Sequence, residues 1–387
     1  MKICGIIAEY DPFHNGHAWQ LSQARRISRA DIIVCVISGR FTQRGMPALF
    51  SPHLRARAAL LASADLVLQM PFSFSVSNAE RFSQGGVSIL KQLGVQALSF
   101  GVEAESIPWI DAAAMLLENP TEEYRTCLRQ ALDDGVSFPK AQGIALAKAL
   151  NVSPDVFSMP NASLAICYAR ANLKLHANMA LYPVPRSGRY HDAQLHDDGP
   201  LPSATAVRGA IAAGDWPLVK SAVPPFSAAL LEHAVSEGDV HPPHALDPLL
   251  RWRLRSERDF SQLPDLSEGI ENKLSSAANC LDRNAMILSV KSKRYSYARI
   301  SRLLTHALLG TRSDLLSPTP EYAYVLGFRQ EASPLLRAAH DNGFPIFANA
   351  QNNFSYDMDL DIQADDLWNL GAGKPFGAIF REKPVIL

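Results

Sequence analysis

The chain has 387 residues, of which 47% are apolar and 19% are charged, so we expect a globular protein long enough for two domains. Its 37 Lys and Arg residues and 38 Asp and Glu residues give a net charge of −1, which excludes a generally basic protein and restricts any contact with nucleic acid to a local patch. The five cysteines form no Cys-x-x-Cys motif, no apolar run reaches membrane length and no signal-peptide pattern opens the chain. We therefore predict reduced thiols and a cytoplasmic protein.

Strand and helix patterns alternate in the first half of the chain, which predicts an α/β fold with a doubly wound parallel sheet. Strands are expected at Ile3–Ala8, Ile32–Ile37, Leu66–Met70, Ala97–Gly101 and Met179–Pro183. Helices are expected at Gly16–Ser28, Pro52–Ser63, Arg81–Leu93, Ile107–Glu118, Thr121–Asp133, Pro139–Leu150 and Asn161–Leu173. From about Asp215 the strand signal fades, so we predict one domain over 1–215 and a mostly helical second domain over 216–387, with an irregular tail from Phe354.

A turn with two histidines follows the first strand. The buried run ends at Asp11-Pro12, and His14-Asn15-Gly16-His17 then leads into a helix. A helix N-terminus attracts anions, so two imidazoles placed there predict a phosphate site. Solvated surface histidines are the alternative. The His-x-Gly-His pattern resembles the signature of the nucleotidyltransferase superfamily that includes class I aminoacyl-tRNA synthetases. In that group the imidazoles stabilise charge while a nucleophile attacks the α-phosphorus of ATP and pyrophosphate leaves.

Three other segments contain candidate ligand-binding residues. Arg40 and Arg44, in the loop after the second strand, could bind a phosphate or carboxylate or could simply face solvent. Ser203 has the position of a helix cap, but Ser203-x-Thr205-x-x-Arg208 is also similar to the second signature of the same nucleotidyltransferases, which holds the β- and γ-phosphates. Tyr190-His191-Asp192 lacks an accompanying nucleophile motif, which favours a structural or substrate-contact role.

The segment from Ser289 to Arg312 has no acidic residue. Its basic residues could meet phosphates, and its tyrosines could stack on unpaired bases, so we predict an RNA surface here. A solvated helix face is the alternative. The candidate RNA-binding residues are Lys291, Lys293, Arg294, Tyr295, Arg299 and Arg302, with Tyr297 and Arg312 beside them.

Together these segments resemble the bacterial tRNA(Met) cytidine acetate ligase family along nearly the whole chain. The matching stretches are Glu9-Tyr10-Asp11-Pro12-Phe13-His14-Asn15-Gly16-His17, Ser38-Gly39 with Gln43-Arg44-Gly45, Phe100-Gly101 with Glu103, Pro160-Asn161, Tyr190-His191-Asp192-Ala193, Ser203-Ala204-Thr205 with Arg208, Lys293-Arg294-Tyr295 with Thr305-His306, and Asp359-Leu360-Asp361. The resemblance implies a Rossmann-like ATP-binding domain over 1–215 and a tRNA-binding domain over 216–387.

The resemblance also implies site residues. Catalytic roles fall on His14, His17 and Arg208. ATP contacts are expected along Ile7, Ala8, Glu9, Tyr10, Asp11, Pro12, Phe13, His14, Asn15, Gly16, His17 and Gln20, and at Gly101, Asn161, Arg186, Ser203 and Thr205. Asp11 departs from the Asn usual in the family, and its charge beside a phosphate site is unfavourable unless a metal or an arginine offsets it. The spacing leaves open whether Arg186 or Arg189 contacts ATP.

The family uses ATP and acetate to form N4-acetylcytidine at the wobble position of elongator tRNA(Met). We therefore expect acetate to attack the α-phosphorus of ATP, with Mg²⁺ assisting, and the cytidine amine of the anticodon loop then to attack the acetyl-adenylate. No obligate protein partner is evident. The alternatives are a small-molecule adenylyl- or cytidylyltransferase and a nucleotide-sensing RNA-binding protein without turnover.

Overall fold

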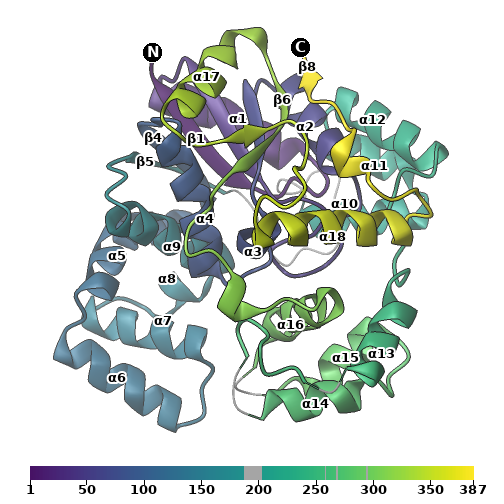
Figure 1. Cartoon of the computed structure of the whole chain (residues 1–387). Helices are drawn as coiled ribbons and strands as arrows, with labels where there is room; N and C mark the ends of the chain where they lie inside the picture. The colour runs from purple at the N-terminus through teal and green to yellow at the C-terminus, as the bar shows by residue number, and fades with distance from the viewer. Residues whose placement is uncertain (187–202, 258, 267–268, 293–294) are drawn as a thin grey trace.

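One mixed sheet organises the fold of this computed structural model, which describes residues 1–186, 203–257, 259–266, 269–292 and 295–387. The strand order is β5-β4-β1-β2-β3-β6-β7, and β8 pairs with β6. The first five strands are parallel, which confirms the predicted doubly wound sheet (Figure 1). The bounds are β1 (Ile3–Ala8), β2 (Ile32–Ile37), β3 (Leu66–Gln69), β4 (Ala97–Val102), β5 (Ala180–Pro185), β6 (Ala323–Phe328), β7 (Ile346–Phe347) and β8 (Val385–Ile386).

Helices cover both faces of the sheet because side chains alternate along each strand. In β2, Ile32, Val34 and Val36 face one core, and the residues between them face the other. One core takes apolar residues from α4 (Ala79–Gln92), α9 (Pro160–Lys174) and α17 (Ser333–Asp341). The other takes them from α1 (Asn15–Ser28) and α2 (Pro52–Leu61). The central strands are therefore apolar along their whole length, which explains why the sequence reveals them so clearly.

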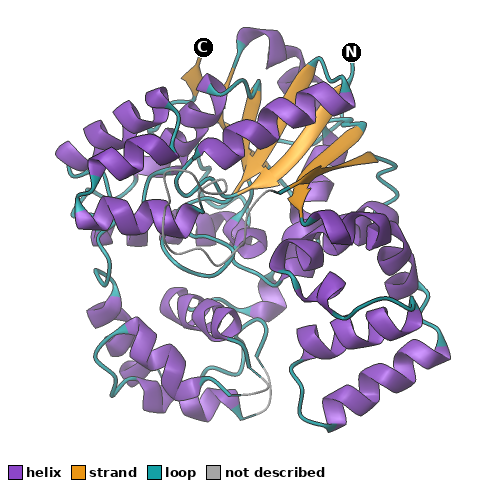
Figure 2. Ribbon diagram, turned by 180° about the vertical axis from the view of Figure 1, so that it is seen from behind, coloured by secondary structure: helices purple, strands orange, loops and turns teal. Residues whose placement is uncertain are grey.

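The remaining helices form groups at the edges of the sheet. One group lies between β4 and α9: η1 (Ala104–Trp109), α5 (Ile110–Glu118), α6 (Glu122–Asp133), α7 (Phe138–Ala149) and α8 (Asp155–Ser158). A second comprises α10 (Ala204–Ala213), α11 (Trp216–Ala222) and α12 (Pro225–Ser236), and a third α13 (Asp247–Ser256), α14 (Ile270–Ala277), α15 (Arg283–Val290) and α16 (Tyr297–Leu309). Figures 1 and 2 show the α5–α8 and α13–α16 groups on opposite sides of the molecule below the sheet. Short segments α3 (Phe72–Ser75), η2 (Ser313–Leu315), η3 (Gln330–Ala332) and η4 (Ala378–Phe380) connect these parts.

The C-terminal part of the chain returns to the sheet, which corrects two predictions. β6 pairs antiparallel with β3, and β7 and β8 pair with β6, so the strands do not end before Asp215. The tail is not irregular, because it contains the helix α18 (Tyr356–Gly371). The strand β6 is a short apolar run, a pattern that periodicity alone does not distinguish from a buried helix. The boundary near 215 stays a prediction, since the residues beyond it complete the sheet of the first half.

The helix α18 buries polar side chains, which explains why its sequence does not look like a helix. Asp357, Asp361, Asp365 and Asn369 repeat at four-residue spacing and are all at most 4% exposed. Asp361 accepts hydrogen bonds from the Phe72 backbone N–H (2.7 Å) and the Tyr322 hydroxyl (2.5 Å). This row of polar residues therefore fixes the turn after β3, and it lies beside an apolar face formed by Leu360, Ala364 and Trp368.

The burial of Asp361 should make the stability of the fold depend on pH. Burial raises the pKa of Asp361 to about 8 from its ordinary 3.8. Between these values the unfolded chain has released this proton and the folded chain still holds it, so the contribution of Asp361 to stability falls as pH rises. Asp361→Asn, which stays neutral, should remove this part of the pH slope.

Thermal unfolding of wild type and Asp361→Asn between about pH 5 and about pH 8 measures the effect. Asp359→Asn is the matched control, because Asp359 is exposed on the same helix. The Asp361→Asn variant should gain stability relative to wild type as pH rises, and the control should not. Parallel pH profiles for wild type and Asp361→Asn would contradict this prediction.

Candidate active site

Two histidines shape the turn between β1 and α1. His14 is the N-cap of α1, and its Nδ1 accepts a hydrogen bond from the Gly16 backbone N–H at 3.1 Å. The Nδ1 of His17 accepts from the His14 backbone N–H at 3.3 Å. Because both Nδ1 atoms accept, the proton of each neutral ring is on Nε2. The turn therefore holds two imidazole N–H donors at the positive end of a helix.

The two rings are neutral near pH 7. They stack with centroids 3.7 Å apart and planes 19° apart. Burial, followed by the positive charges of Arg186 and Arg208, lowers the pKa of His14 to about 3. Burial, followed by His14 and Arg186, also lowers the pKa of His17 well below its usual value. In this state the histidines supply hydrogen bonds, and the two arginines supply the positive charge for an anion.

The rest of the turn is held by the protein core. Tyr10 packs its ring 4.8 Å from that of His17 and places its hydroxyl 3.5 Å from the Cys35 sulfur. The carbonyl of Phe13 accepts from the Ser227 hydroxyl at 2.9 Å. Asn15 donates from Nδ2 to the Ser221 carbonyl at 2.9 Å. These bonds to α11 and α12 fix the turn before any ligand binds.

The other residues predicted to contact the nucleotide near this turn differ in burial. Ile7, Tyr10, Pro12 and Phe13 are buried. The helix α4 packs directly on β1 at Ile7, because a Cβ added to Gly86 would stand only 2.5 Å from the Ile7 side chain. Ala8, Asn15, Gly16 and Gln20 are partly exposed. At the buried positions the backbone, more than the side chain, is available to a nucleotide.

Asp11 is compensated by Arg208, which accounts for its charge beside the predicted phosphate site. Its Oδ2 is 3.5 Å from Arg208 Nη1, and its Oδ1 accepts from the Leu49 backbone N–H at 2.8 Å. Arg208 also donates to the Asp11 carbonyl and, from Nη2, to the Thr205 hydroxyl at 3.2 Å. Since the Arg208 side chain remains 37% exposed, it still has a face open to a phosphate. Ser203 accepts from the Ala206 backbone N–H at 3.2 Å and so caps α10, while its phosphate role stays a prediction.

Residues from β4, β5 and α9 form the next part of the site. The side chain of Arg186 lies over Gly101, 3.4 Å from where a Cβ would stand, and its charge acts on both histidines. Asn161 donates from Nδ2 to Glu103 Oε1 at 2.8 Å. Arg189, the alternative to Arg186, lies outside the described residues, as does the segment Tyr190-His191-Asp192.

Glu9 and Arg55 join the ends of β1 and β2. Glu9 Oε1 accepts from the Gln43 backbone N–H at 2.5 Å, and burial raises the pKa of Glu9. Arg55 is fully buried and donates to the Glu9 carbonyl at 2.6 Å and to the Gly39 carbonyl. Burial lowers the pKa of Arg55 to about 10. The sequence does not single out Arg55, because an arginine in a helix is usually solvated.

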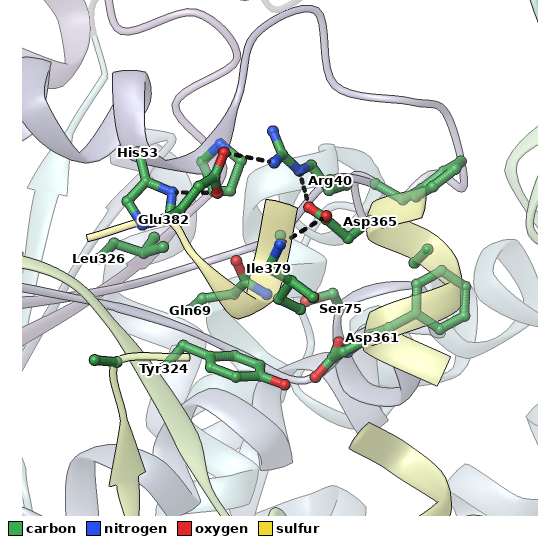
Figure 3. Close-up of a pocket in the computed structure, with 16 residues that line it drawn as sticks. Arg40, His53, Gln69, Ser75, Tyr324, Leu326, Asp361, Asp365, Ile379 and Glu382 are labelled. Carbon is green, nitrogen blue, oxygen red and sulfur yellow. Dashed lines mark hydrogen bonds and ion pairs between the residues drawn. The ribbon is translucent and has the colours of Figure 1, made fainter. Parts of the chain in front are cut away.

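Arg40 does not belong to this anion site, so the interpretation of its loop as an anion site is wrong for Arg40. Its side chain pairs with Asp365 (2.5 Å) and Glu382 (2.9 Å), and His53 Nδ1 is 2.9 Å from the second oxygen of Glu382 (Figure 3). The cavity between these residues measures about 20 Å³, room for about one water molecule. These ion pairs therefore fasten the C-terminal segment to the loop after β2. The cavity between them is too small to bind a nucleotide.

A turn in the same loop connects the site with the α13–α16 group. Beyond Gln43, Gly45 has a φ of +77°, and a Cβ on it would stand 2.8 Å from Arg302 Cα. Its carbonyl accepts hydrogen bonds from the Arg283 guanidinium (2.8 Å) and from the Thr305 hydroxyl. The segment 43–45 therefore touches Glu9 at one end and α16 at the other.

The structure divides the predicted RNA-binding residues. Lys291 is exposed, whereas Lys293 and Arg294 lie outside the described residues. The guanidinium of Arg299 lies 5.2 Å from the centroid of the Tyr295 ring and donates to the Asp265 carbonyl. Arg302 is only 7% exposed and lies 3.6 Å from Asp265 Oδ2. Arg302 therefore stabilises the packing of the α13–α16 group and is not exposed to an RNA.

The described part of the chain contains no group of three or more His, Cys, Asp or Glu side chains that could hold a metal ion. Among its described residues, no helix is long and apolar enough to cross a membrane.

Comparisons with known proteins agree with this geometry. A family model described as HIGH Nucleotidyl Transferase matches residues 1–377, the class that the parallel sheet and the paired histidines define. Proteins from Clostridium acetobutylicum and Caldicellulosiruptor saccharolyticus, both named tRNA(Met) cytidine acetate ligase, are 34% identical over 389 residues (96% of both chains) and 35% identical over 350 residues (87% of this chain, 85% of the relative). The chain belongs to the tRNA(Met) cytidine acetate ligase family within that class.

Solved structures of Thermotoga maritima TmcAL share the whole fold. The apo form superposes with a TM-score of 0.91 and the form bound with α-thio ATP with 0.89. Both are 26% identical in sequence and cover 100% of both chains.

Proposed function

We propose that the protein is an ATP-dependent ligase that forms N4-acetylcytidine at the wobble position of elongator tRNA(Met) through an acetyl-adenylate. The observation that carries this proposal is the pair of stacked neutral histidines, each with an Nε2–H donor, whose rings feel the positive charge of Arg186 and, at His14, of Arg208. Family membership and the TmcAL structure bound with an ATP analogue support it.

In the first step an acetate oxygen attacks the α-phosphorus of ATP, and the bond to the β-phosphate breaks. Negative charge increases on the phosphate oxygens as pyrophosphate leaves. His14 and His17 donate hydrogen bonds to this charge, and Arg186 and Arg208 stabilise it electrostatically. The donors are already fixed by the bonds to their Nδ1 atoms, so little reorganisation is needed.

In the second step the cytidine N4 attacks the acetyl carbon, AMP leaves with the electrons of the broken anhydride bond, and the amine loses one proton. An exocyclic cytosine amine is a weak nucleophile, which is why acetate has to be activated. The wobble base is unpaired in an anticodon loop and can be splayed out of the stack.

We propose that Mg²⁺ arrives with the phosphates of ATP. Magnesium is commonly held by one or two carboxylates, waters and substrate phosphates. Asp11 is an acidic residue close to the histidine turn in sequence, but it is already bound to Leu49 and Arg208. The metal would therefore be coordinated mainly by the nucleotide and water, and it would offset phosphate charge.

The α13–α16 group is the proposed tRNA-binding part. Lys291 is exposed on it, Tyr295 is partly exposed with Arg299 over its ring, and Lys293 and Arg294 extend the same segment of sequence. The segment 43–45 links this group to Glu9, so tRNA bound there would lie close to the adenylate site.

The acyl donor tests the proposal. Incubation with ATP, labelled acetate and tRNA should label the RNA and release AMP, whereas labelled acetyl-coenzyme A without ATP should not. Exchange of labelled pyrophosphate into ATP should depend on acetate, because adenylation is the reversible first step.

Other outcomes would overturn the proposal. Labelling by acetyl-coenzyme A alone would leave the histidine site without its role in adenylation. Transfer of a nucleotide to a phosphate-ester metabolite would make the protein a small-molecule nucleotidyltransferase. ATP and tRNA binding with no turnover would make it a sensor.

A further inference from the structure

Trp252 presents its indole to solvent on α13. It is 67% exposed, more than Phe376 at 58% and Phe138 at 53%. Leu250 and Leu254 are 0% and 1% exposed and pack into the core shared with α16. A residue two positions from each must face the opposite side of the helix. The fold therefore gains little burial from this side chain.

Two arginines lie on one side of Trp252. Arg255, one turn further along α13, is exposed, and Arg251, four residues before Arg255, is partly exposed. Arg253 has a structural role, because it donates to the Ala307 carbonyl at 3.2 Å and pairs with Glu257. An exposed indole beside two arginines combines an aromatic stacking face with charges that attract phosphate.

The net positive charge of the α13–α16 group favours binding of a polyanion. Residues 247–312 contain 12 Lys and Arg residues against 7 Asp and Glu residues, whereas residues 104–175, which include α5–α8, contain 6 against 8. α13 is also bound to α16, which begins in the segment predicted to bind RNA (Figure 1). The positive charge is therefore concentrated on the helix group that carries Trp252.

We propose that Trp252 stacks on an unpaired base of an RNA, with Arg255 and Arg251 next to the flanking phosphates. The inference rests on the proposed function for its RNA, and it adds a second contact region to the segment around Lys291. Stacking is tolerant of base identity, so Trp252 would contribute affinity for single-stranded loops and not sequence preference.

A series of variants of the full-length protein tests the stacking. Trp252→Ala should weaken binding of an anticodon stem-loop RNA by about tenfold, the typical loss of one base–aromatic stack. Trp252→Phe should keep most of the affinity, and Trp252→Leu should lose it although it remains apolar. Phe138→Ala, which removes an exposed aromatic from the opposite helix group, is the control and should bind as wild type.

Further measurements separate stacking from other contacts. Wild type should prefer the stem-loop over a fully paired duplex of the same length, and Trp252→Ala should lose part of this preference. Arg255→Gln should flatten the dependence of binding on salt concentration. Acetate-dependent pyrophosphate exchange without tRNA should be unchanged in Trp252→Ala, because the indole is outside the ATP site.

The outcomes are distinct. Equal affinity of Trp252→Leu and wild type, or a change of oligomeric state in Trp252→Ala by light scattering, would overturn the proposal in favour of an apolar protein contact. A wild-type protein that binds the stem-loop but shows no acetate-dependent turnover would overturn the proposed function, while the binding series would still decide the role of Trp252.

Discussion

Replacing either His14 or His17 by Ala should slow acetate-dependent AMP formation by about a hundredfold or more, because each variant removes one Nε2–H donor that is fixed in place before charge develops on the phosphates. Loss of one such preorganised donor typically costs that much. ATP affinity should fall less, because the contact strengthens as pyrophosphate leaves. Quenched-flow measurement of AMP, with ATP binding measured separately, gives both quantities.

A second substitution at position 14 separates chemistry from folding. His14 also caps α1, so His14→Ala should lose about 1 kcal/mol of stability in addition. His14→Asn keeps a side chain that caps helices well but lacks the imidazole donor, so it should fold normally and still be slow. His340→Ala, at an exposed histidine on α17, is the control. Turnover close to wild type in His14→Asn and His17→Ala would remove both residues from the mechanism.

The second large effect is expected on stability, at the cluster that holds the C-terminal segment. Arg40→Met should lower the free energy of unfolding by about 3–5 kcal/mol, because it leaves the buried carboxylate of Asp365 without its charged partner. Arg40 and Asp365 side chains are each 4% exposed, so solvent cannot replace the lost interaction. Denaturant unfolding measures the change.

Two further variants show whether the loss of stability comes from the unpaired carboxylate of Asp365. Arg40→Met combined with Asp365→Leu should recover part of the loss, since it removes the buried unpaired charge of Asp365 while Glu382 still lacks Arg40. Arg337→Met, at an exposed arginine on α17, should change stability by less than about 0.5 kcal/mol. A single Arg40→Met variant as stable as wild type would show that the ion pair contributes nothing.

The cluster also gives the fold a defined weakness in acid. Burial opposes ionisation of Glu382, but bonds from His53 and Arg40 hold its pKa at about 2, below its ordinary 4.5. The folded state therefore binds fewer protons than the unfolded chain between these values. The stabilisation from Glu382 is complete above about pH 4.5 and is lost as pH falls toward 2.

The sequence predicts the elements whose signal is local. β1 and β2 are buried on both faces and appear as continuous apolar runs, and the paired histidines follow β1 directly. Alternation with helices then predicts the parallel order.

The strand β6 could not be predicted in this way, because its identity as a strand depends on a partner far away in the sequence. It pairs antiparallel with β3, with Leu66 opposite Phe328 and Gln69 opposite Tyr324. No neighbouring segment of the sequence indicates this pairing, and a short apolar run by itself fits a buried helix equally well.

The helix α18 escapes prediction for a different physical reason. Prediction from periodicity assumes that the buried face of a helix is apolar. In α18 the buried surface mixes Asp357, Asp361 and Asp365 with apolar residues, so the apolar pattern is interrupted. The partners of Asp361 and Asp365 include Phe72 and Arg40, which come from distant parts of the chain. Only the folded arrangement makes burial of these carboxyl groups favourable.

In the candidate site, too, residues with a local sequence signal are predicted, and residues defined by contacts between distant segments are not. The resemblance predicts His14, His17 and Arg208, and it identifies the charge of Asp11 as unfavourable unless a metal or an arginine offsets it; the structure places Arg208 beside it. Arg55 could not be found in this way, because its role is to hold two backbone carbonyls, and no residue pattern records that. The exposure of Trp252 likewise follows only from which face of α13 is buried.

The return of the chain to the sheet at β6 has a consequence for how the protein is made. Until residues 323–328 leave the ribosome, the edge of β3 that they cover has unpaired backbone N–H and C=O groups. The apolar side chains of β3 are also more exposed to water than in the folded protein. Nascent or truncated chains that end before β6 would therefore be prone to aggregate. A deletion that isolates the nucleotide-binding half should retain residues 323–387, joined back to the sheet by a linker, if it is to remain folded.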